Sequence, residues 1–469
     1  MKQKRENKGL NISARSFITA LLILFALMLL TYILTLVLPG GEYKRIADSA
    51  GNMVIDTQAG YTPVEGGLPF YKWLLSPFLV LTAEGSGTII AVIAFLLVIG
   101  GIFNSLDRCG LMLYMLKRVV RRFGHARYML MAVVVLFFMA MGSFIGSFEE
   151  VIPLVPIVVS LAVGLGWDAL IGVGMSLLAA GCGFSAGVCN PFTVGIAQEL
   201  AGLPMFSGIW LRVVSFLVVY ILLLFFLRSH AKKIEQPLSG DLAGEDFCPS
   251  ASMDRALALF GGLLGLGILL VLSSSFITAL QDYTMVIVAA MFLAAGLAST
   301  LAAGMSPGKL GSSFFNGLVS VLPAVLMILM ASSIKYTLTE GKILDTILYY
   351  AVAAAGTLPR WVVILFLYLV VLVMNFFIPS GSAKAFLLMP LILPVAQIFE
   401  LSPQLCVMAY AFGDGFSNVL YPTNPVLLIS LGLAGVSYGS WFKWTWKFQA
   451  VILICTSLLL LFGLAVGYA

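Results

Sequence analysis

Charged residues are scarce in this sequence. Asp, Glu, Lys and Arg together make up 10% of the 469 residues, whereas hydrophobic residues make up 61%. Soluble domains carry about 25% charged residues, so a soluble globular protein is excluded. The long apolar runs are typical of a polytopic helical membrane protein, and the alternating pattern of a membrane barrel is absent. We expect an all-α polytopic protein of the cell (inner) membrane, surrounded by the lipid bilayer.

Residues that bind metals or perform covalent chemistry are also few. His125 and His230 are the two histidines, and the six cysteines are scattered without a C-x-x-C pair. This is a poor inventory for a zinc or haem site. No Walker A motif is present, so an ATP-driven pump is not expected. The apolar core holds no convincing nucleophile or metal set, which argues against an intramembrane enzyme. We expect no cofactor apart from a coupling ion, Na⁺ or H⁺, and no nucleic-acid partner.

Basic residues predict which segments face the cytoplasm. Lysines and arginines are concentrated in residues 1–15 and again between Lys117 and Arg127. The positive-inside rule places both segments, and so the N-terminus, in the cytoplasm. Residues 40–72 are predicted to form an external loop, and 111–120 an interfacial helix. After the linker, spans are predicted at about 256–272, 285–303 and 314–332.

One stretch, Met141–Pro156, departs from a plain membrane helix. Glu149 and Glu150 stand there between apolar runs, with glycines before them and prolines after them. A charge at membrane depth costs roughly 2.5–3.5 kcal/mol on insertion scales, and broken backbone needs protein or a water-filled cavity around it. The stretch predicts the tip of a re-entrant hairpin that lines a transport site. The alternative is a short loop at the membrane face.

The second half of the sequence repeats the first. Pro156 and Asn190 are 34 residues apart, as are Pro390 and Asn424, and each asparagine precedes a proline. The first hairpin enters from the cytoplasm and the second from outside, so the repeats are predicted to be inverted, as in many secondary transporters. We expect about nine spans and two hairpins; counting every hairpin arm as a full span would give about eleven to thirteen.

The predicted boundaries follow from this repeat. The first repeat covers residues 1–230, with a hairpin at about 128–165 and a broken helix at about 169–200. A cytoplasmic linker covers 231–254. The remainder, 255–469, contains a linking span and the second repeat, with a hairpin at about 361–398 and a broken helix at about 402–434.

Four tips are predicted to converge in this arrangement, at residues 146–150, 183–193, 380–384 and 414–424. Each offers backbone groups and short polar side chains. Helix ends that point at the centre add partial charges. The predicted substrate-binding residues are Ser147, Glu149, Glu150, Asn190, Thr193, Ser380, Ser382, Lys384, Asp414, Asn418, Thr423 and Asn424.

The two asparagines have two interpretations. Unwound carbonyls with serine and asparagine oxygens bind sodium, which predicts one site from Ser147 with Asn190 and a second from Ser382 with Asn424. Alternatively, each Asn-Pro pair only stops a helix, because proline removes a hydrogen-bond donor.

The charged residues at the tips also have two interpretations. Glu150 and Lys384 could form a structural ion pair across the pseudo-twofold axis. Even then Glu149 and Asp414 remain, and an excess of acid suits a cationic group of the substrate, a coupling cation or a transported proton. Lys384 could instead serve an anionic substrate.

These motifs resemble the C4-dicarboxylate anaerobic carrier family, and within it a branch of basic amino acid antiporters. The resemblance rests on Gly-Ser-Phe-Glu149-Glu150, on the Asn190-Pro191 break, and on their counterparts around Ser380 and Asp414. It covers nearly the whole chain. It implies the ion transporter superfamily fold, with inverted repeats, two hairpins and a homodimer of scaffold and transport domains. The tips and the Asn-Pro breaks would then hold the substrate and a coupling ion.

Two functions remain open at this point. The first is exchange or ion-coupled transport of a basic amino acid such as arginine or ornithine, which the acidic excess favours. The second is a sodium- or proton-coupled carrier for a C4-dicarboxylate or short-chain acid, which Lys384, the hydroxyls and the helix N-termini favour. Both are secondary active transport of a small molecule by alternating access.

Overall fold

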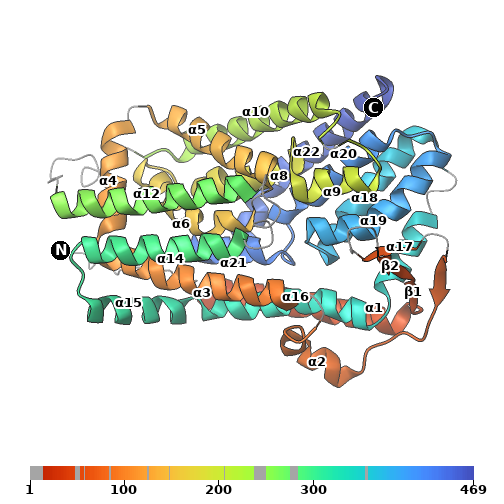
Figure 1. Ribbon diagram of the computed structural model, residues 1–469, viewed down its shortest axis with the longest axis horizontal. Helices are drawn as coiled ribbons and strands as arrows, with labels where there is room; N and C mark the ends of the chain where they lie inside the picture. The colour runs from red at the N-terminus through yellow and green to blue at the C-terminus, as the bar shows by residue number, and fades with distance from the viewer. Residues whose placement is uncertain are drawn as a thin grey trace.

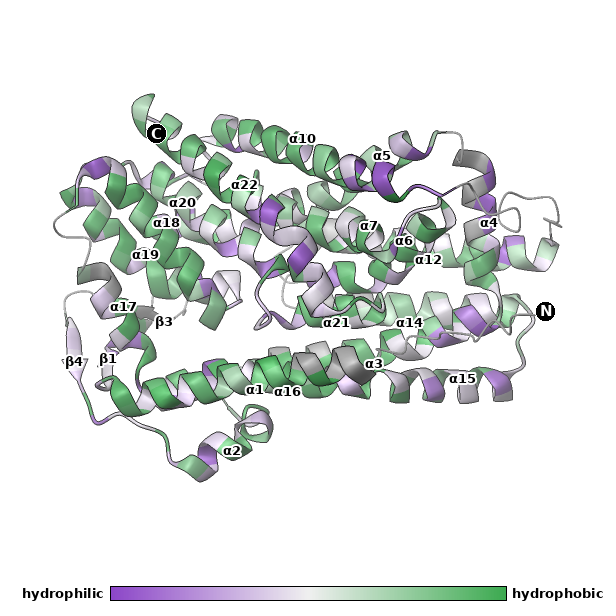
Figure 2. Cartoon of the chain, turned by 180° about the vertical axis from the view of Figure 1, so that it is seen from behind, coloured by the Kyte–Doolittle hydropathy of each residue, from purple (hydrophilic) through white to green (hydrophobic). Residues whose placement is uncertain are grey.

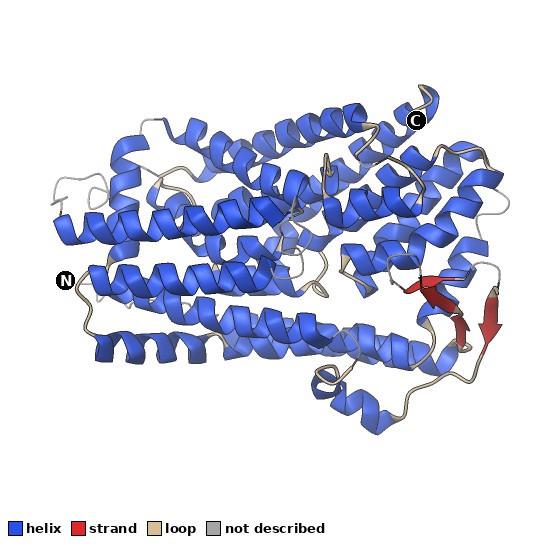
Figure 3. Cartoon of the chain, viewed as in Figure 1, coloured by secondary structure: helices blue, strands red, loops and turns tan. Residues whose placement is uncertain are grey.

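The computed structural model describes residues 14–47, 53–56, 59–83, 86–123, 126–146, 148–204, 206–236, 250–274, 284–353 and 358–468. These residues are almost entirely helical (Figure 3), and many of the longer helices run along the long axis of the molecule (Figure 1). Eight helical segments in these ranges are long and apolar enough to cross a membrane. The predicted all-α membrane class is therefore confirmed.

The described elements follow one another in this order. In the first half they are α1 (Ala14–Val37), β1 (Gly41–Tyr43), β2 (Arg45–Ala47), β3 (Met53–Ile55), β4 (Tyr61–Pro63), α2 (Phe70–Leu79), α3 (Ser86–Arg108), α4 (Leu111–Phe123), α5 (Arg127–Ala140), η2 (Met141–Ile145), η3 (Glu149–Leu154), α6 (Val155–Gly164), α7 (Ala169–Val173), η4 (Gly174–Leu178), α8 (Ala179–Ala186), η5 (Pro191–Gly195), α9 (Ile196–Leu200) and α10 (Ile209–Ile234). In the second half they are α12 (Ala251–Ser274), α14 (Thr284–Ala302), α15 (Pro307–Ser320), α16 (Leu322–Glu340), α17 (Leu344–Ala353), α18 (Arg360–Phe377), α19 (Gly381–Ile398), α20 (Pro403–Gly415), η7 (Phe416–Val419), α21 (Pro425–Leu433) and α22 (Tyr438–Ala465).

The loop predicted at 40–72 contains short strands that the sequence did not reveal. β1 pairs antiparallel with β4, and β2 with β3. Asp345 at the start of α17 holds them in place, because it accepts hydrogen bonds from the Tyr43 N–H at 2.9 Å and from Arg45 Nη2 at 2.9 Å. Burial, followed by the negative charge of Asp345, raises the pKa of Tyr43 to about 12. The strands are thus part of the folded structure.

The span predicted at 314–332 is wrong in its bounds. Two helices, α15 and α16, form one apolar run of 34 residues from Pro307 to Glu340, with an interruption at Val321. Pro323 stands at the start of α16, where it removes a backbone donor and so separates the two helices. Lys335 lies inside α16, beyond the predicted end of this span.

Two helices that carry candidate residues lie at the centre of the fold. Every residue of α8 is buried, and so is α20 from Gln404 onward. Hydrophobic residues make up much of the outer helices, and hydrophilic residues occur at helix ends and in the middle of the molecule (Figure 2). Small residues allow the close packing: a Cβ atom on Gly183 of α8 would lie 2.0 Å from the Met139 carbonyl oxygen of α5.

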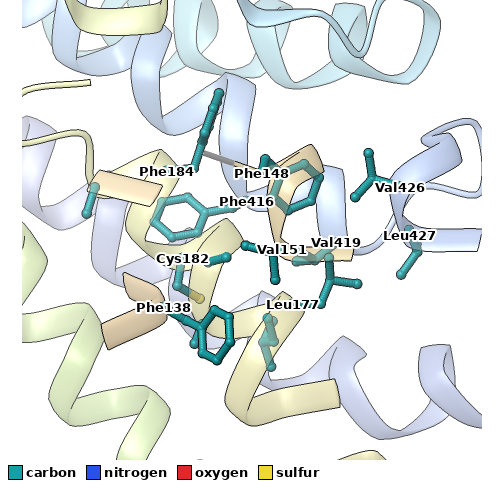
Figure 4. Packing of buried hydrophobic residues seen from close by; sticks show 14 of the residues in the cluster. Phe138, Phe148, Val151, Leu177, Cys182, Phe184, Phe416, Val419, Val426 and Leu427 are labelled. Carbon is teal, nitrogen blue, oxygen red and sulfur yellow. The ribbon is translucent and has the colours of Figure 1, made fainter. Parts of the chain in front are cut away.

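An apolar cluster joins elements from both halves next to the first acidic tip. Phe148 and Val151 at η3 meet Phe184 of α8 and Val419 of η7 in this cluster (Figure 4). The Phe148 and Phe184 rings lie 6.0 Å apart. A Cβ atom on Gly181 would lie 2.4 Å from a Val419 methyl group, so α8 and η7 are in direct contact. The cluster holds the acidic tip against the centre of the protein.

Candidate functional site

The first candidate tip lies directly on the first helix break, which we define as residues 187–190 between α8 and η5. Gly146 has a left-handed backbone (φ 77°), and a Cβ atom there would lie 2.4 Å from Asn190 Oδ1. Ser143 binds the same break: its Oγ accepts from the Val188 N–H at 2.9 Å, and its carbonyl accepts from the Cys189 N–H at 3.1 Å. Ser143 was not among the predicted residues.

The two predicted asparagines occupy equivalent positions as helix caps. Asn190 Oδ1 accepts from the Phe192 N–H at 2.9 Å, and Asn424 Oδ1 accepts from the Val426 N–H at 2.9 Å. Each asparagine precedes the proline that begins the next helical segment. Each cap satisfies a donor that a helix N-terminus would otherwise leave open. This is the structural role weighed above; sodium binding stays a prediction.

A buried ion pair forms the centre of the second half of the site. Lys384 of α19 pairs with Asp414 of α20, and both side chains are 0% exposed. The Lys384 ammonium group also donates to Asn375 Oδ1 and, at 3.1 Å, to the Ile378 carbonyl. The ammonium group, which carries three donors, therefore has one charged partner and two neutral acceptors around it. The alternative that paired Lys384 with Glu150 is therefore replaced by the pair with Asp414.

The second tip is fastened to α20 and touches the first half of the chain. The Tyr410 hydroxyl donates to the Gly381 carbonyl. A Cβ atom on Gly381 would lie 2.9 Å from Asp414 Oδ2 and 2.9 Å from the Thr193 methyl carbon. The second tip, the second broken helix and the segment after the first break therefore meet at Gly381, as the predicted convergence requires.

An amide chain extends from the ion pair to the second break, residues 420–424 between η7 and α21. Asn375 Nδ2 donates to Ser417 Oγ at 2.7 Å and to Asn418 Oδ1 at 3.0 Å. Asn424 Nδ2 donates to the same Asn418 oxygen at 2.9 Å. These four side chains are between 1% and 4% exposed. Asn375 and Ser417 were not among the predicted site residues.

The first acidic tip adds negative charge to this site. Glu149 begins η3 and is half-buried, and its carboxylate lies close enough to that of Asp414 for the two to repel each other. Glu150 follows it and is also half-buried. Asp414, which pairs with Lys384, is therefore also exposed to the charge of Glu149.

The remaining predicted residues occupy varied positions. Thr193 and Thr423 are buried, and their hydroxyls have no hydrogen-bond partner within the described ranges. Ser382 is half-buried and Ser380 is exposed. No hydrogen bond joins Ser382 to Asn424 in the part of the chain that the structure describes, and Ser147 lies outside that part. Among the described residues no group of three or more His, Cys, Asp or Glu side chains could hold a metal ion.

A buried arginine supports the first break from the other side. Arg212 of α10 is 1% exposed; its Nε donates to the Val188 carbonyl at 3.2 Å, and its Nη2 donates to the Ser207 carbonyl at 2.8 Å. Its Nη1 lies 3.4 Å from the Tyr468 hydroxyl. Arg212 therefore ties the first break to the start of α10 and to the C-terminal segment. A lone arginine inside an apolar run was the signal that the sequence offered for it.

Comparison with protein families decides the class of this protein. The family described as "C4-dicarboxylate anaerobic carrier" matches residues 17–465. The chain belongs to this carrier family. It is accordingly a multi-pass membrane transporter and not an enzyme. The predicted resemblance to the family is confirmed.

Curated relatives of this carrier come from two bacteria. The "Putative basic amino acid antiporter YfcC" of Escherichia coli K12 is 28% identical over 413 residues, which is 84% of this chain and 81% of the relative. An uncharacterized protein of Haemophilus influenzae Rd is 26% identical over 392 residues, 80% of this chain and 76% of that protein.

Two solved transporter structures are also similar to this carrier. The Alcanivorax borkumensis YdaH transporter has a TM-score of 0.44 and 19% sequence identity, over 96% of this chain and 98% of its own. Neisseria gonorrhoeae MtrF, whose structure is described with a class of antimetabolite efflux pumps, has a TM-score of 0.43 and 16% identity, over 94% of each chain.

Proposed function

We propose that this carrier is a secondary active transporter of a basic amino acid of the arginine or ornithine type. It works by exchange or by coupling to an ion, Na⁺ or H⁺, and by alternating access. The name of the Escherichia coli relative is in line with this substrate class. The charges at the centre of the protein support it independently of that name.

The observation that carries the proposal is the state of Lys384. Its ammonium group pairs with Asp414 and donates to Asn375 and the Ile378 carbonyl, so a substrate carboxylate would have to displace one of these three partners. Binding an anion there would require breaking a buried ion pair, which costs about 3–5 kcal/mol when one partner is left uncompensated. The ammonium group of Lys384 thus has a structural role and is not expected to bind a substrate carboxylate.

The acidic side of the same site remains open to a cation. Lys384 pairs with Asp414 Oδ1, while Asp414 Oδ2 is buried without a hydrogen-bond partner among the described residues. Glu149 lies near it and repels it. A guanidinium or ammonium group placed between Glu149 and Asp414 would relieve this repulsion and form charge-assisted hydrogen bonds. A sodium ion or a proton at the same acids would serve as the coupling ion.

One observation favours the second candidate, a carrier of C4-dicarboxylates or short-chain acids. Helix α19 begins at Gly381, and its N-cap residue Ser380 makes no side-chain capping bond. The open N–H groups of a helix N-terminus attract a carboxylate. In this case the anion would bind at the start of α19, with Ser380 and Ser382, and the ion pair would lie behind it.

Exchange in proteoliposomes tests the proposal. Vesicles loaded with unlabelled arginine should take up labelled arginine or ornithine, and Glu149→Gln should lower the initial rate at least about 10-fold, because it removes a charged partner of the substrate cation. The matched control is Glu199→Gln, since Glu199 is an exposed acid of α9 away from this cluster. Its rate should match the unmodified protein.

The same vesicles test the second candidate. Sodium-dependent or proton-dependent uptake of succinate, insensitive to Glu149→Gln and abolished by Lys384→Ala, would contradict the basic amino acid proposal and support carboxylate transport. Arginine exchange that proceeds equally in sodium-free buffer and across a collapsed pH gradient would support obligatory exchange over ion coupling.

We propose two further properties, one implied by the family resemblance and one by the basic residues near the N-terminus. The protein forms a homodimer, which the molecular mass of the detergent-solubilised particle tests. Its N-terminus lies in the cytoplasm, which follows from the basic residues of 1–15. Labelling of a single cysteine introduced at the N-terminus, from one side of the membrane only, tests this orientation.

A further inference from the structure

Asn375 contacts both the central ion pair and η7, the element that leads into the second break. It lies in the last turn of α18, is 1% exposed, and was absent from the predicted site. Its oxygen accepts from the Lys384 ammonium group. Its amide nitrogen donates hydrogen bonds to Ser417 Oγ and Asn418 Oδ1. Every strong hydrogen-bonding group of the side chain except one oxygen lone pair is therefore used.

These bonds fix which way the amide faces. Only the oxygen of Asn375 can accept from Lys384, and only the nitrogen can donate to Asn418 Oδ1. Asn418 Oδ1 also accepts a hydrogen bond from Asn424 Nδ2 at 2.9 Å. Asn424 Oδ1 in turn caps the start of α21. The chain from Lys384 through Asn375 and Asn418 to Asn424 is thus continuous and directional.

Helix α21 connects this chain to the rest of the fold. It packs against α16, the second part of the long apolar run from Pro307 to Glu340, and it also contacts η3, the element that begins with Glu149. A change at the ion pair would therefore reach the cap of α21 through Asn375 and Asn418. Buried polar chains of this kind are rigid when fully bonded, because an unbonded member costs more at low dielectric than in water.

We propose that Asn375 is a positioning residue of the transport cycle: it holds Lys384 on Asp414 and links the state of this pair to the N-cap of α21. The inference rests on the proposed function in one respect, namely that the pair belongs to the transport site. A basic substrate that binds at Asp414 competes with Lys384 for its carboxylate. Asn375 keeps the displaced ammonium group bonded and transfers the change to Asn418 and Asn424.

Thermal unfolding of the purified protein tests the contacts without any substrate. Asn375→Leu is combined with Lys384→Met in one double-mutant cycle and with Asn418→Leu in a second. We expect the fall in Tm caused by Asn375→Leu to be less than half as large in either variant background as in the unmodified protein. Additive effects in both cycles would overturn the proposal. The second cycle decides the question if Lys384→Met does not fold.

A matched control is available on α20. Gln404 is 2% exposed and hydrogen-bonds to Gln198 and Ser207, at the end of α20 opposite Asp414. Gln404→Leu removes a buried amide as Asn375→Leu does, but its effect should add to that of Lys384→Met.

Transport kinetics separate positioning from mere stability. When rates are normalised to the amount of folded protein, Asn375→Leu should lower the maximal rate of arginine exchange about 10-fold, while KM should stay within about 3-fold. A 10-fold fall corresponds to the loss of about one charge-assisted hydrogen bond in the conformational step of the cycle. Gln404→Leu should leave both unchanged. An Asn375→Leu rate that falls only with the amount of folded protein would overturn the proposal. If the unmodified protein exchanges no arginine, the proposed function fails while the unfolding cycles still decide the role of Asn375.

Discussion

The contact between α5 and α8 makes a sharp prediction, because a single methyl group should force these helices apart. A Cβ atom on Gly183 would lie 2.0 Å from the Met139 carbonyl oxygen and 2.6 Å from two further Met139 backbone atoms. Ordinary contact begins at 3.4 Å, so the two backbones would have to separate by roughly 1.4 Å. No flexible side-chain end is available to give way.

The expected cost of Gly183→Ala follows from this geometry. Overpacking a well-packed core costs about 1–3 kcal/mol, and the upper value applies because backbone must move. At about 2 cal/mol/K of unfolding entropy per residue, a chain of this length would lose about 3 °C in Tm. The shift would also displace the first break, so arginine exchange should fall with it.

The matched control is Gly265→Ala in α12. Among the described residues, no atom outside the adjoining turns of α12 lies within 4 Å of a Cβ atom at Gly265. Alanine is favoured over glycine in a helix by up to about 1 kcal/mol. Its Tm should equal or exceed that of the unmodified protein. Scanning fluorimetry of the two purified variants makes the comparison. Equal Tm values for Gly183→Ala and Gly265→Ala would refute the close approach of α5 and α8.

Three further variants test the ion pair, the buried arginine and a titrating helix cap. Lys384→Met should cost about 3–5 kcal/mol of unfolding free energy because it leaves the Asp414 carboxylate buried alone, and the double variant with Asp414→Leu should recover most of it; an equal loss in the double variant would count against the pair. Arg212→Lys should cost about 2 kcal/mol, because a lysine cannot reach the Val188 and Ser207 carbonyls together; an unchanged denaturation midpoint would contradict this. Burial alone would raise the pKa of Asp168, but hydrogen bonds from His230 and the Ile171 N–H hold it below its ordinary value. The ionised Asp168 side chain therefore stabilises the fold fully above about pH 4, and this contribution is lost as the pH falls further. In Asp168→Asn, stability should depend less on pH in this acid range. Superimposable profiles of stability against pH for the two proteins would contradict the assignment.

Features that depend on the local sequence could be predicted. Glycines before Glu149 and prolines after it indicated a break in the backbone, and the structure has a left-handed glycine and a short 3₁₀ segment there. The Asn-Pro pairs indicated helix interruptions, and both asparagines cap the helix that follows them. These features need only backbone rules. The inverted relation of the two halves stays a prediction.

Features that depend on long-range contacts could not be predicted. The partner of Lys384 is set by how α19 packs on α20, and the pattern of residues alone suggested Glu150 instead of Asp414. The strands near Tyr43 depend on Asp345, which lies 302 residues away in the chain. Asn375 did leave a signal: it is the one amide in the apolar helix α18. A polar side chain at that depth is expensive unless it has partners, so it indicates a site.

The ion pair between Lys384 and Asp414 has a consequence for the electrical behaviour of the carrier. Each elementary charge that crosses the membrane potential involves about 2.3 kcal/mol per 100 mV. Tyr410 and the ion pair fasten α19 to α20. If the two helices move as one unit in the proposed cycle, they carry equal and opposite charges, and the membrane voltage does no net work on the pair. The voltage sensitivity of the cycle is then left to the acids of the first tip and to the cargo. A monovalent cation bound at Glu149 would cancel that charge as well, so the loaded carrier would cross with less electrical work than the empty one.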